Sequence, residues 1–275
     1  MTDTGPGGFA DIHSHLVPGV DDGARTLDDT LASVERMTKV GIRRILTTPH
    51  LNGSVTRNGE ELEARLSAVD EAFDRAAIAV GEKFPEVDFK RGYEVMLDIP
   101  DVDFSDPRVR MAGTSFVLIE WPRLRVPPGT TKVLERIMSE GYRPIIAHPE
   151  RYIGIDRNLA VIARWREAGA YLQVNYGSLS GRYGPQAKGI AVQLLRGGWA
   201  HYLASDFHAQ DKARIYFREV WEQLETWHAG ESLTHLFLTN PGRVFNDEIP
   251  FPVAPLPPAT GLWARVKGLM GQDPR

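Results

Sequence analysis

Short apolar runs alternate with amphipathic stretches along this sequence, and this alternation constrains the fold more than any other feature. The runs have the length and the Val, Ile, Leu and aromatic content of buried strands. The predicted strands are 9–13, 42–50, 88–95, 115–121, 143–149, 171–176 and 202–208. Strands separated by helices within one unit of about 250 residues predict parallel strands with helical crossovers. Seven such strands indicate an incomplete relative of the eight-stranded α/β barrel.

The stretches between the strands carry helix signals. In 58–80, apolar residues recur at helical spacing. They are Leu62, Leu66, Val69, Phe73 and Val80. Thr26 and Asp29 resemble a capping box that opens a helix, and Gly41 would close that helix. A later helix is marked by Ile215, Val220, Trp221 and Leu224.

The C-terminal part differs in composition, and we divide the chain into a barrel, 1–250, and a tail, 251–275. The stretch PFPVAPLPP, 250–258, contains five prolines and predicts an extended, semi-rigid linker outside the core. Beyond it, apolar residues of 261–272 would share one helical face. They are Leu262, Trp263, Val266, Leu269 and Met270. This segment either packs back on the barrel or docks weakly on a partner.

Composition excludes several classes of protein and site. The chain has no cysteine, which excludes disulfides, thiolate nucleophiles and Cys-ligated zinc. A net charge of -4 and a pI near 6.1 argue against nucleic-acid binding. No run of ~18 apolar residues predicts a membrane span, and the N-terminus lacks the pattern of a secretory signal. We therefore expect a cytoplasmic protein whose metals, if any, are held by His, Asp and Glu, a ligand set suited to Mn²⁺, Fe²⁺ or Zn²⁺.

Polar side chains stand near the C-terminal end of every predicted strand. They are His13 and His15, His50, Glu94, Glu120, His148, Asn175, and Asp206 with His208. Strand alternation points His13 and His15 the same way, and Asp21 and Asp22 follow on a loop. In a parallel barrel the C-terminal strand ends converge on one mouth, so we expect these residues to meet there as a metal site.

The alternative is that each of these polar residues stands at its strand end by chance and has no shared function. It fits poorly, because a charged group after a fully apolar run such as VLIE costs free energy unless it is paired or metal-bound. The remaining histidines are expected to be structural. They are His201, His228 and His235.

Several motifs give the sequence a family resemblance. They are DIHSHLVPGVDDGA, TTPH, GYEV, LIEWP, AHPERY, VNYGSLSGRYG, ASDFH and NPGRVF. Over about residues 9 to 250 the chain resembles the PHP superfamily, named for polymerase and histidinol phosphatase. Within it, the chain is similar to the bacterial manganese-dependent protein-tyrosine phosphatases of capsule and exopolysaccharide loci. The resemblance implies a distorted (β/α)7 barrel with its metal site at the C-terminal mouth.

The resemblance also implies roles for individual residues. It implies three divalent metals, Mn²⁺ first, with Fe, Zn, Co or Mg as alternatives. Glu94 would bridge two of them. One of these two sites would be completed by His13, His15 and Asp206, and the other by Glu120 and His148. The third site would be formed by Asp22, His50 and His208. Arg151 and Arg214 would bind the phosphate, and Asp22 or His50 could assist the leaving group.

The implied function is hydrolysis of protein phosphotyrosine by a metal-activated water. The implied partner is an autophosphorylating bacterial tyrosine kinase at the membrane, which would bring this chain to the inner face. Two alternatives stay open: a small-molecule phosphatase of the histidinol-phosphate type, and a non-catalytic metal-binding regulator of polysaccharide assembly. A metal-dependent amidohydrolase is disfavoured, because no predicted strand ends in the lysine that such barrels place between their metals. The oligomeric state is not predicted.

Overall fold

The computed structural model describes residues 8–155, 159–209 and 214–257. Its strands are β1 Phe9–Asp11, β2 Ile42–Thr47, β3 His50–Asn52, β4 Asp88–Arg91, β5 Glu94–Met96, β6 Phe116–Glu120, β7 Arg143–Ala147, β8 Tyr171–Asn175 and β9 Tyr202–Ala204. Its α-helices are α1 Leu27–Lys39, α2 Gly59–Lys83, α3 Thr130–Ser139, α4 Ala160–Glu167, α5 Tyr176–Ser180, α6 Gly184–Arg196, α7 Phe217–Thr226, α8 Glu231–Thr234 and α9 Asn240–Val244.

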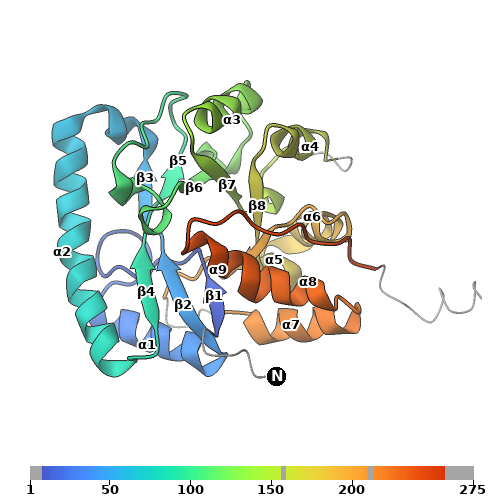
Figure 1. Ribbon diagram of the computed structural model, residues 1–275, viewed down its shortest axis with the longest axis horizontal. Helices are drawn as coiled ribbons and strands as arrows, with labels where there is room; N and C mark the ends of the chain where they lie inside the picture. The colour runs from blue at the N-terminus through green and yellow to red at the C-terminus, as the bar shows by residue number, and fades with distance from the viewer. Residues whose placement is uncertain (1–7, 156–158, 210–213, 258–275) are drawn as a thin grey trace, which may run out of the picture.

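The strands form two parallel sheets, which places the chain in the α/β class as predicted (Figure 1). One sheet has the order β1-β2-β4 and the other has the order β3-β5-β6-β7-β8-β9. Every pairing within them is parallel. A single parallel bridge, Ser14 to Phe207, joins the segments that follow β1 and β9.

The predicted number of strands is wrong for the described residues, because two predicted strands each break in two. The stretch 42–50 forms β2 and β3, and 88–95 forms β4 and β5. Pro49 stands at the first break and has no N–H to donate to a ladder. At the second break, a Cβ on Gly92 would lie 2.7 Å from the Met111 Cα, so only glycine allows this approach. At both breaks the chain leaves the first sheet for the second.

The predicted N-terminal helices are confirmed. Helix α1 opens with the expected capping box, in which the Asp29 N–H donates to Thr26 and the Thr26 N–H donates to the Asp29 carboxylate. It ends at Lys39, just before Gly41, whose φ is +92°. Helix α2 covers the predicted stretch, with Asn58 as its N-cap, and buries one apolar face. Figure 1 shows α2 along one edge of the molecule.

Several strands, such as β6, are buried on both faces. Along β6, Val117 and Ile119 join the large core beneath the helices, whereas Phe116 and Leu118 join a second core. This second core draws on β1, β2, β6, β7 and β9, and so contains residues of both sheets. Continuous apolar runs are expected of parallel strands that are covered on both sides. The two sheets therefore share an interior.

The predicted linker packs on the protein as far as it is described. Residues 251–257 have no regular structure, as expected, but Val253 and Leu256 are buried in the large core. The Leu256 N–H donates to the Leu195 carbonyl, which ties the segment to α6. The expectation that 250–258 stays outside the core is thus wrong up to Pro257, because its two aliphatic side chains gain more from burial than from exposure. The predicted amphipathic segment 261–272 lies outside the described residues.

Within the described ranges, none of the helices combines the length and apolar content that crossing a membrane requires.

Candidate metal centre

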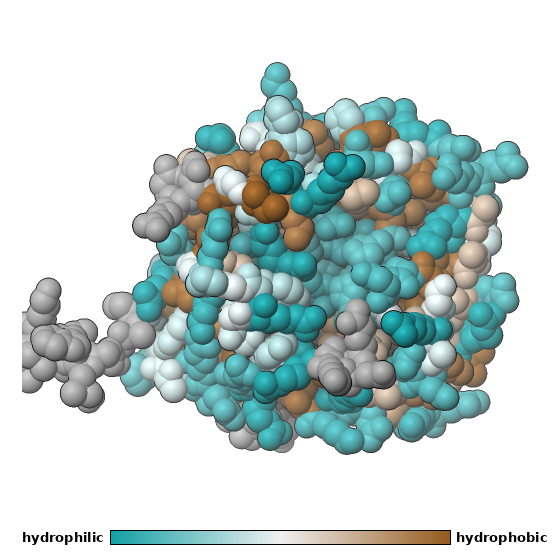
Figure 2. All heavy atoms as spheres, turned by 180° about the vertical axis from the view of Figure 1, so that it is seen from behind, coloured by the Kyte–Doolittle hydropathy of each residue, from teal (hydrophilic) through white to brown (hydrophobic). Residues whose placement is uncertain are grey.

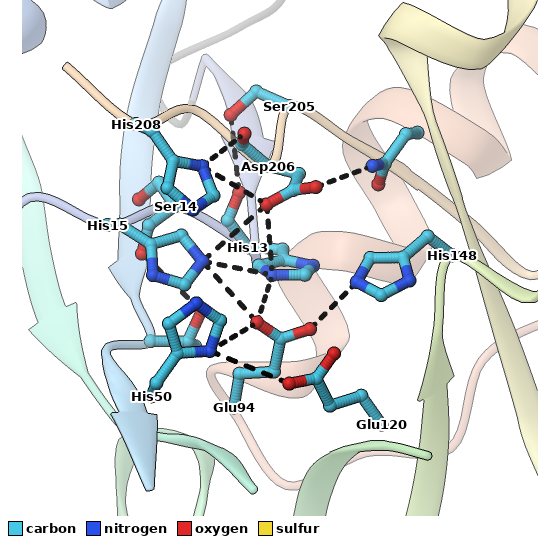
Figure 3. Close-up of polar contacts among 12 residues, drawn as sticks. His13, Ser14, His15, His50, Glu94, Glu120, His148, Ser205, Asp206 and His208 are labelled. Carbon is cyan, nitrogen blue, oxygen red and sulfur yellow. Dashed lines mark hydrogen bonds and ion pairs between the residues drawn. The ribbon is translucent and has the colours of Figure 1, made fainter. Parts of the chain in front are cut away.

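The residues predicted from the strand ends lie together in one cluster (Figure 3). His13 and His15 follow β1, Glu120 ends β6, and His148 follows β7; Asp206 and His208 follow β9. His50 and Glu94 differ from the prediction, because they begin β3 and β5. Each stands just after the break at which the chain changes sheet. His148 and Asp206 have φ values of +34° and +49°, which are strained for residues with a Cβ and are typical of functional positions.

His13 and His15 form a pair suited to holding a cation. Both side chains are fully buried, and their Nε2 atoms are 3.4 Å apart. His15 Nδ1 lies 2.8 Å from the Asp21 carboxylate, which only accepts hydrogen bonds, so this nitrogen carries the proton. The Nε2 lone pair of His15 therefore faces the centre of the cluster.

The tautomer of His13 follows from a chain of side-chain hydrogen bonds. The Asp206 carboxylate only accepts hydrogen bonds, so Asn175 must donate to it through Nδ2, at 2.7 Å. The Asn175 Oδ1 is then left to accept a hydrogen bond from the Gln173 Nε2. Gln173 then presents Oε1 to His13 Nδ1, at 2.8 Å, and this nitrogen is the donor. When both rings are neutral, their two Nε2 lone pairs face each other, an arrangement that requires a cation between them and is typical of metal-binding histidines.

Two buried carboxylates complete the centre of the cluster. Glu94 Oε2 is 3.2 Å from His13 Nε2 and 3.2 Å from His50 Nδ1, and its Oε1 is 2.8 Å from His148 Nε2. Asp206 Oδ1 is 3.5 Å from the Nε2 atoms of both His13 and His15. Each carboxylate therefore touches several imidazoles at once, as expected for the ligands of a multi-metal site.

The cluster opens to solvent on the side of Asp22. This side chain is 67% exposed, and its Oδ1 is 3.4 Å from Nε2 of both His50 and His208. Glu120 Oε1 lies on the other side of His50, 3.7 Å from its Nδ1. On the face of the molecule opposite to that of Figure 1, the surface has a hydrophilic hollow near its centre (Figure 2).

Among the described residues, three sets of ligand atoms lie close enough to hold a metal ion, with all atoms of a set within 4.8 Å of one another. They are His15, Asp22, His50 and His208; His13, His15 and Glu94; and His50, Glu94 and Glu120. The implied partition into three metals differs in detail, because His15 also reaches the Asp22 set and His50 also reaches Glu94 and Glu120. Asp206 and His148 join the cluster through the contacts given above.

Burial and charge act against each other within the cluster. Burial alone would lower the pKa of His13, but the negative charges of Glu94 and Asp206 raise it to about 9. Burial, reinforced by the charge of Glu94, raises the pKa of Glu120 to about 7. Burial and the nearby Arg151 guanidinium lower the pKa of His148. Its Nδ1 is buried and has no hydrogen-bond partner among the described residues. The donor set thus fits divalent cations, which would balance the carboxylates without protons.

Arg151, expected to bind phosphate, lies against the cluster, and Arg214, expected to do the same, does not. Arg151 Nη1 donates to Asp206 Oδ2 at 2.6 Å, and its guanidinium carbon lies 4.2 Å from the centre of the Tyr183 ring. Arg214 is 69% exposed and pairs with Glu219 of α7, and its guanidinium lies over the Tyr216 ring. Of these two arginines, Arg151 is the one placed beside a group held at the cluster.

Sequence reasoning missed several supporting residues. Gln173 orients His13, and its signal was its place two residues before Asn175 on the same face of β8. Asp21, which precedes Asp22 on the same loop, bonds to His15, a contact that the sequence does not predict. Glu150 is buried and accepts from the Asn175 N–H and the Ser178 hydroxyl, which fixes the turn that carries Arg151. Spacing along the chain places Gln173 on the same face as Asn175, but it does not show any of these contacts.

Comparison with known proteins agrees with this site. The family model described as capsular polysaccharide synthesis, CpsB/CapC, matches residues 9–246. This chain belongs to the CpsB/CapC family. The match spans the strands, the cluster and Arg151, and it confirms the resemblance drawn from the motifs.

Curated relatives are similar over nearly their whole length. The tyrosine-protein phosphatase YwqE of Bacillus subtilis (strain 168) is 28% identical over 249 residues, which cover 90% of this chain and 95% of the relative. The tyrosine-protein phosphatase CpsB of Streptococcus pneumoniae is 26% identical over 250 residues, which cover 87% and 99%.

Solved structures agree with the fold. One solved structure matches this chain with a TM-score of 0.76 and 28% identity, and the match covers 92% of this chain and all of that chain. It is described as belonging to the crystal structures of YwqE from Bacillus subtilis and CpsB from Streptococcus pneumoniae, unique metal-dependent tyrosine phosphatases. A phosphotriesterase homology protein from Escherichia coli matches with a TM-score of 0.53 at 13% identity, which shows a likeness of fold alone.

Proposed function

We propose that this protein is a metal-dependent protein-tyrosine phosphatase of capsule or exopolysaccharide synthesis. The observation that carries the proposal is the pair of facing Nε2 atoms of His13 and His15, with both Nδ1 atoms held as donors. Beside the pair stand two buried carboxylates and Arg151. The similarity to metal-dependent tyrosine phosphatases along nearly the whole chain supports the same function.

We expect nine side chains to hold the metals, Mn²⁺ first and three ions in all. They are His13, His15, Asp22, His50, Glu94, Glu120, His148, Asp206 and His208. Bound divalent ions supply positive charge for the phosphoryl oxygens and lower the pKa of water towards ~7, which makes a nucleophile at neutral pH. Gln173 and Asp21 keep the histidine lone pairs turned to this centre.

Arg151 would bind the phosphoryl group of the substrate. One of its nitrogens is committed to Asp206, and its other N–H donors, which form no hydrogen bond with the described residues, would reach phosphoryl oxygens held at the cluster. The leaving group of phosphotyrosine is a phenol with a pKa of ~10, which departs without full protonation. Asp22, exposed at the edge of the cluster, is the candidate to assist it.

The finer architecture belongs to the same proposal. We infer that the two sheets act as one distorted (β/α)7 barrel, with the metal site at the C-terminal mouth. The inner core common to both sheets and the Ser14–Phe207 bridge support this arrangement. Six of the nine expected ligands stand at or just after the C-terminal end of a strand. They are His13, His15, Glu120, His148, Asp206 and His208.

The physiological substrate is proposed to be a phosphotyrosine-bearing protein, an autophosphorylating tyrosine kinase that controls capsule or exopolysaccharide synthesis. The family to which the chain belongs supports this context. The protein would act in the cytoplasm, at the inner face of the membrane when bound to the kinase.

The test is turnover of a phosphotyrosine peptide by metal-stripped protein. Mn²⁺, Co²⁺, Mg²⁺ and Zn²⁺ are restored separately, and a matched phosphoserine peptide and histidinol phosphate serve as competing substrates. We expect no turnover without metal, the highest turnover with Mn²⁺, and a clear preference for phosphotyrosine. His13→Ala and Glu94→Ala should lose both bound metal and rate. Preference for histidinol phosphate, or wild-type turnover by either variant, would contradict the proposal.

A further inference from the structure

A pocket of about 380 Å³ has Arg151 in its lining, and none of the nine cluster residues is among its described lining residues. It is lined mainly by apolar and aromatic side chains from three segments, with Leu124, Tyr152, Ile153 and Tyr183 among them. Ile153 is 54% exposed, one of the few large apolar side chains at the surface of the described part of the chain. A concave apolar surface next to a catalytic arginine is a candidate binding site.

Arg151 belongs both to the lining of this pocket and to the contacts of the cluster. Its Nη1 donates to Asp206 in the plane of the guanidinium, and the guanidinium carbon lies 4.2 Å from the centre of the Tyr183 ring, which also lines the pocket. A phosphoryl group bound at the cluster would therefore lie next to the pocket, so the polypeptide that carries the phosphotyrosine, rather than the phosphotyrosine ring, would pass through it.

A second pocket, of about 640 Å³, continues the first along α6. The two pockets share Gln186, and the second extends over Pro185, Gly189 and Ile190 to Gln193. From Gln186 to Gln193 the helix rises roughly 10 Å, which matches about three residues of extended chain. The length and shape of this groove suit a peptide better than a small molecule.

The edge of the groove is basic, although the whole chain is acidic. Arg182 precedes Tyr183 and lies over its ring, at 5.5 Å. Arg123 and Arg125 flank Leu124, and both are exposed. Among the described residues, no carboxylate forms an ion pair with any of these three arginines. Among the described lining residues, the one acidic side chain, Glu150, is buried and bonded to α5. Unpaired cations at the rim favour an acidic partner and speed its association.

We propose that this groove, from Leu124 and Tyr183 to Gln193, binds the polypeptide next to the phosphotyrosine and prefers acidic residues there. The proposal rests on the proposed phosphatase function and adds the substrate sequence that the protein selects. Arg151 joins the two parts of the site, since it touches both the cluster and the groove.

The test uses two substitutions at exposed positions of the groove, Ile153→Asp and Arg182→Glu, in the full-length metal-loaded protein. Three substrates are compared: p-nitrophenyl phosphate, a phosphotyrosine peptide with flanking aspartates, and the same peptide with flanking lysines. For the wild type, kcat/KM should be about tenfold higher for the acidic than for the basic peptide. For each variant, the ratio of kcat/KM for the acidic peptide to kcat/KM for p-nitrophenyl phosphate should fall about tenfold. Arg182→Glu should also abolish or reverse the preference for the acidic over the basic peptide.

Matched controls are Ile249→Asp, at an apolar side chain 55% exposed, and Arg218→Glu on α7, both outside the groove lining. In both controls, the ratio of kcat/KM for the acidic peptide to kcat/KM for p-nitrophenyl phosphate should equal that of the wild type. Ratios unchanged in the groove variants, or changed equally in the controls, would overturn the groove but not the phosphatase. A wild type that hydrolyses p-nitrophenyl phosphate but no phosphotyrosine peptide would instead overturn the proposed function. A parallel fall on all three substrates would show that the pocket takes the aromatic ring or supports Arg151, and would also overturn the proposal.

Discussion

At the scale of single residues, the cluster depends on side chains that touch no substrate. His13 and His15 are useful as ligands only in the tautomer that leaves Nε2 free, and neutral histidine can adopt either form. Gln173 fixes one ring and Asp21 the other. The Gln173 amide is itself oriented by Asn175, which is oriented by Asp206. A line of hydrogen bonds thus runs from one side of the cluster to the other through uncharged amides.

Removing the acceptor on His13 should weaken metal binding. In Gln173→Leu, His13 Nδ1 loses its hydrogen-bond partner and the ring is free to turn. We expect the affinity for Mn²⁺ to fall roughly 10- to 100-fold, as for other supporting partners of metal-bound histidines. Competition with a chelator measures this affinity directly. Gln173→Glu restores an acceptor and should recover most of the loss; equal losses in both variants would point to a packing defect instead.

The geometry of Arg151 should matter as much as its charge. Arg151→Lys keeps the charge but loses the planar fork that can contact Asp206 and phosphate together. We expect kcat/KM for a phosphotyrosine peptide to fall roughly 10- to 100-fold with metal content unchanged. Arg214→Lys is the comparison, because Arg214 is exposed and paired with Glu219, and we expect it to be near wild type. An equal fall in Arg214→Lys would restore the role implied by the family resemblance.

At the scale of elements, several strands end just before the residues that form the cluster. Strand β9 stops at Ala204, and the chain then turns through Asp206 in a left-handed conformation. The opposite end of β9 carries His201, which is structural as predicted: its Nδ1 accepts from the Leu172 N–H at the start of β8. Of the two histidines that flank β9, His201 is therefore structural and His208 belongs to the cluster.

His201 predicts a pH dependence of stability. Burial, with a smaller effect of Arg166, lowers the pKa of His201 to about 4 from the ordinary value of 6.5. The folded protein favours the neutral ring, so its stabilising effect is complete above pH 6.5 and is lost as pH falls from 6.5 towards 4. The loss is at most about 3 kcal/mol in the free energy of unfolding.

Urea unfolding of the metal-free protein at several pH values measures this loss. His201→Asn keeps an acceptor for Leu172 but does not titrate, so its free energy of unfolding should fall less than that of the wild type over this range. The exposed His228, with a φ of +56° that asparagine tolerates, provides the control His228→Asn. If the wild type and His201→Asn lost stability in parallel, His201 would not be the titrating group.

At the scale of the whole molecule, the last described segment closes the core. The run from His235 through α9 packs against β1 and β9 (Figure 1). The chain then passes over α6, held by the bond between the Phe251 N–H and the Asn240 side chain and by that between Leu256 and Leu195. Val253 and Leu256 fill the large core from this side.

Shortening these two side chains should destabilise the protein. We expect Val253→Ala with Leu256→Ala to lower the free energy of unfolding by about 4 kcal/mol, since each leaves a cavity in a packed core. Chemical denaturation measures the change. Ile249→Ala, at an exposed side chain just before the segment, should cost well under 1 kcal/mol. A double variant as stable as Ile249→Ala would mean that 251–257 behaves as the linker predicted from its prolines.

The sequence alone determined the class of the fold and most of the cluster, whereas tertiary structure decided how the cluster is held. Apolar runs and helical periodicity are local signals, so they predicted parallel strands, and strand ends in such folds meet at one edge, which predicted His13, Glu94, His148 and Asp206 as neighbours. The breaks of two strands, the burial of Val253 and the exposed position of Arg214 were not predicted. Neither was the contact between His13 and Gln173, which are 160 residues apart. These features depend on which distant segments meet in space, and that is set by packing of the whole core rather than by any local pattern.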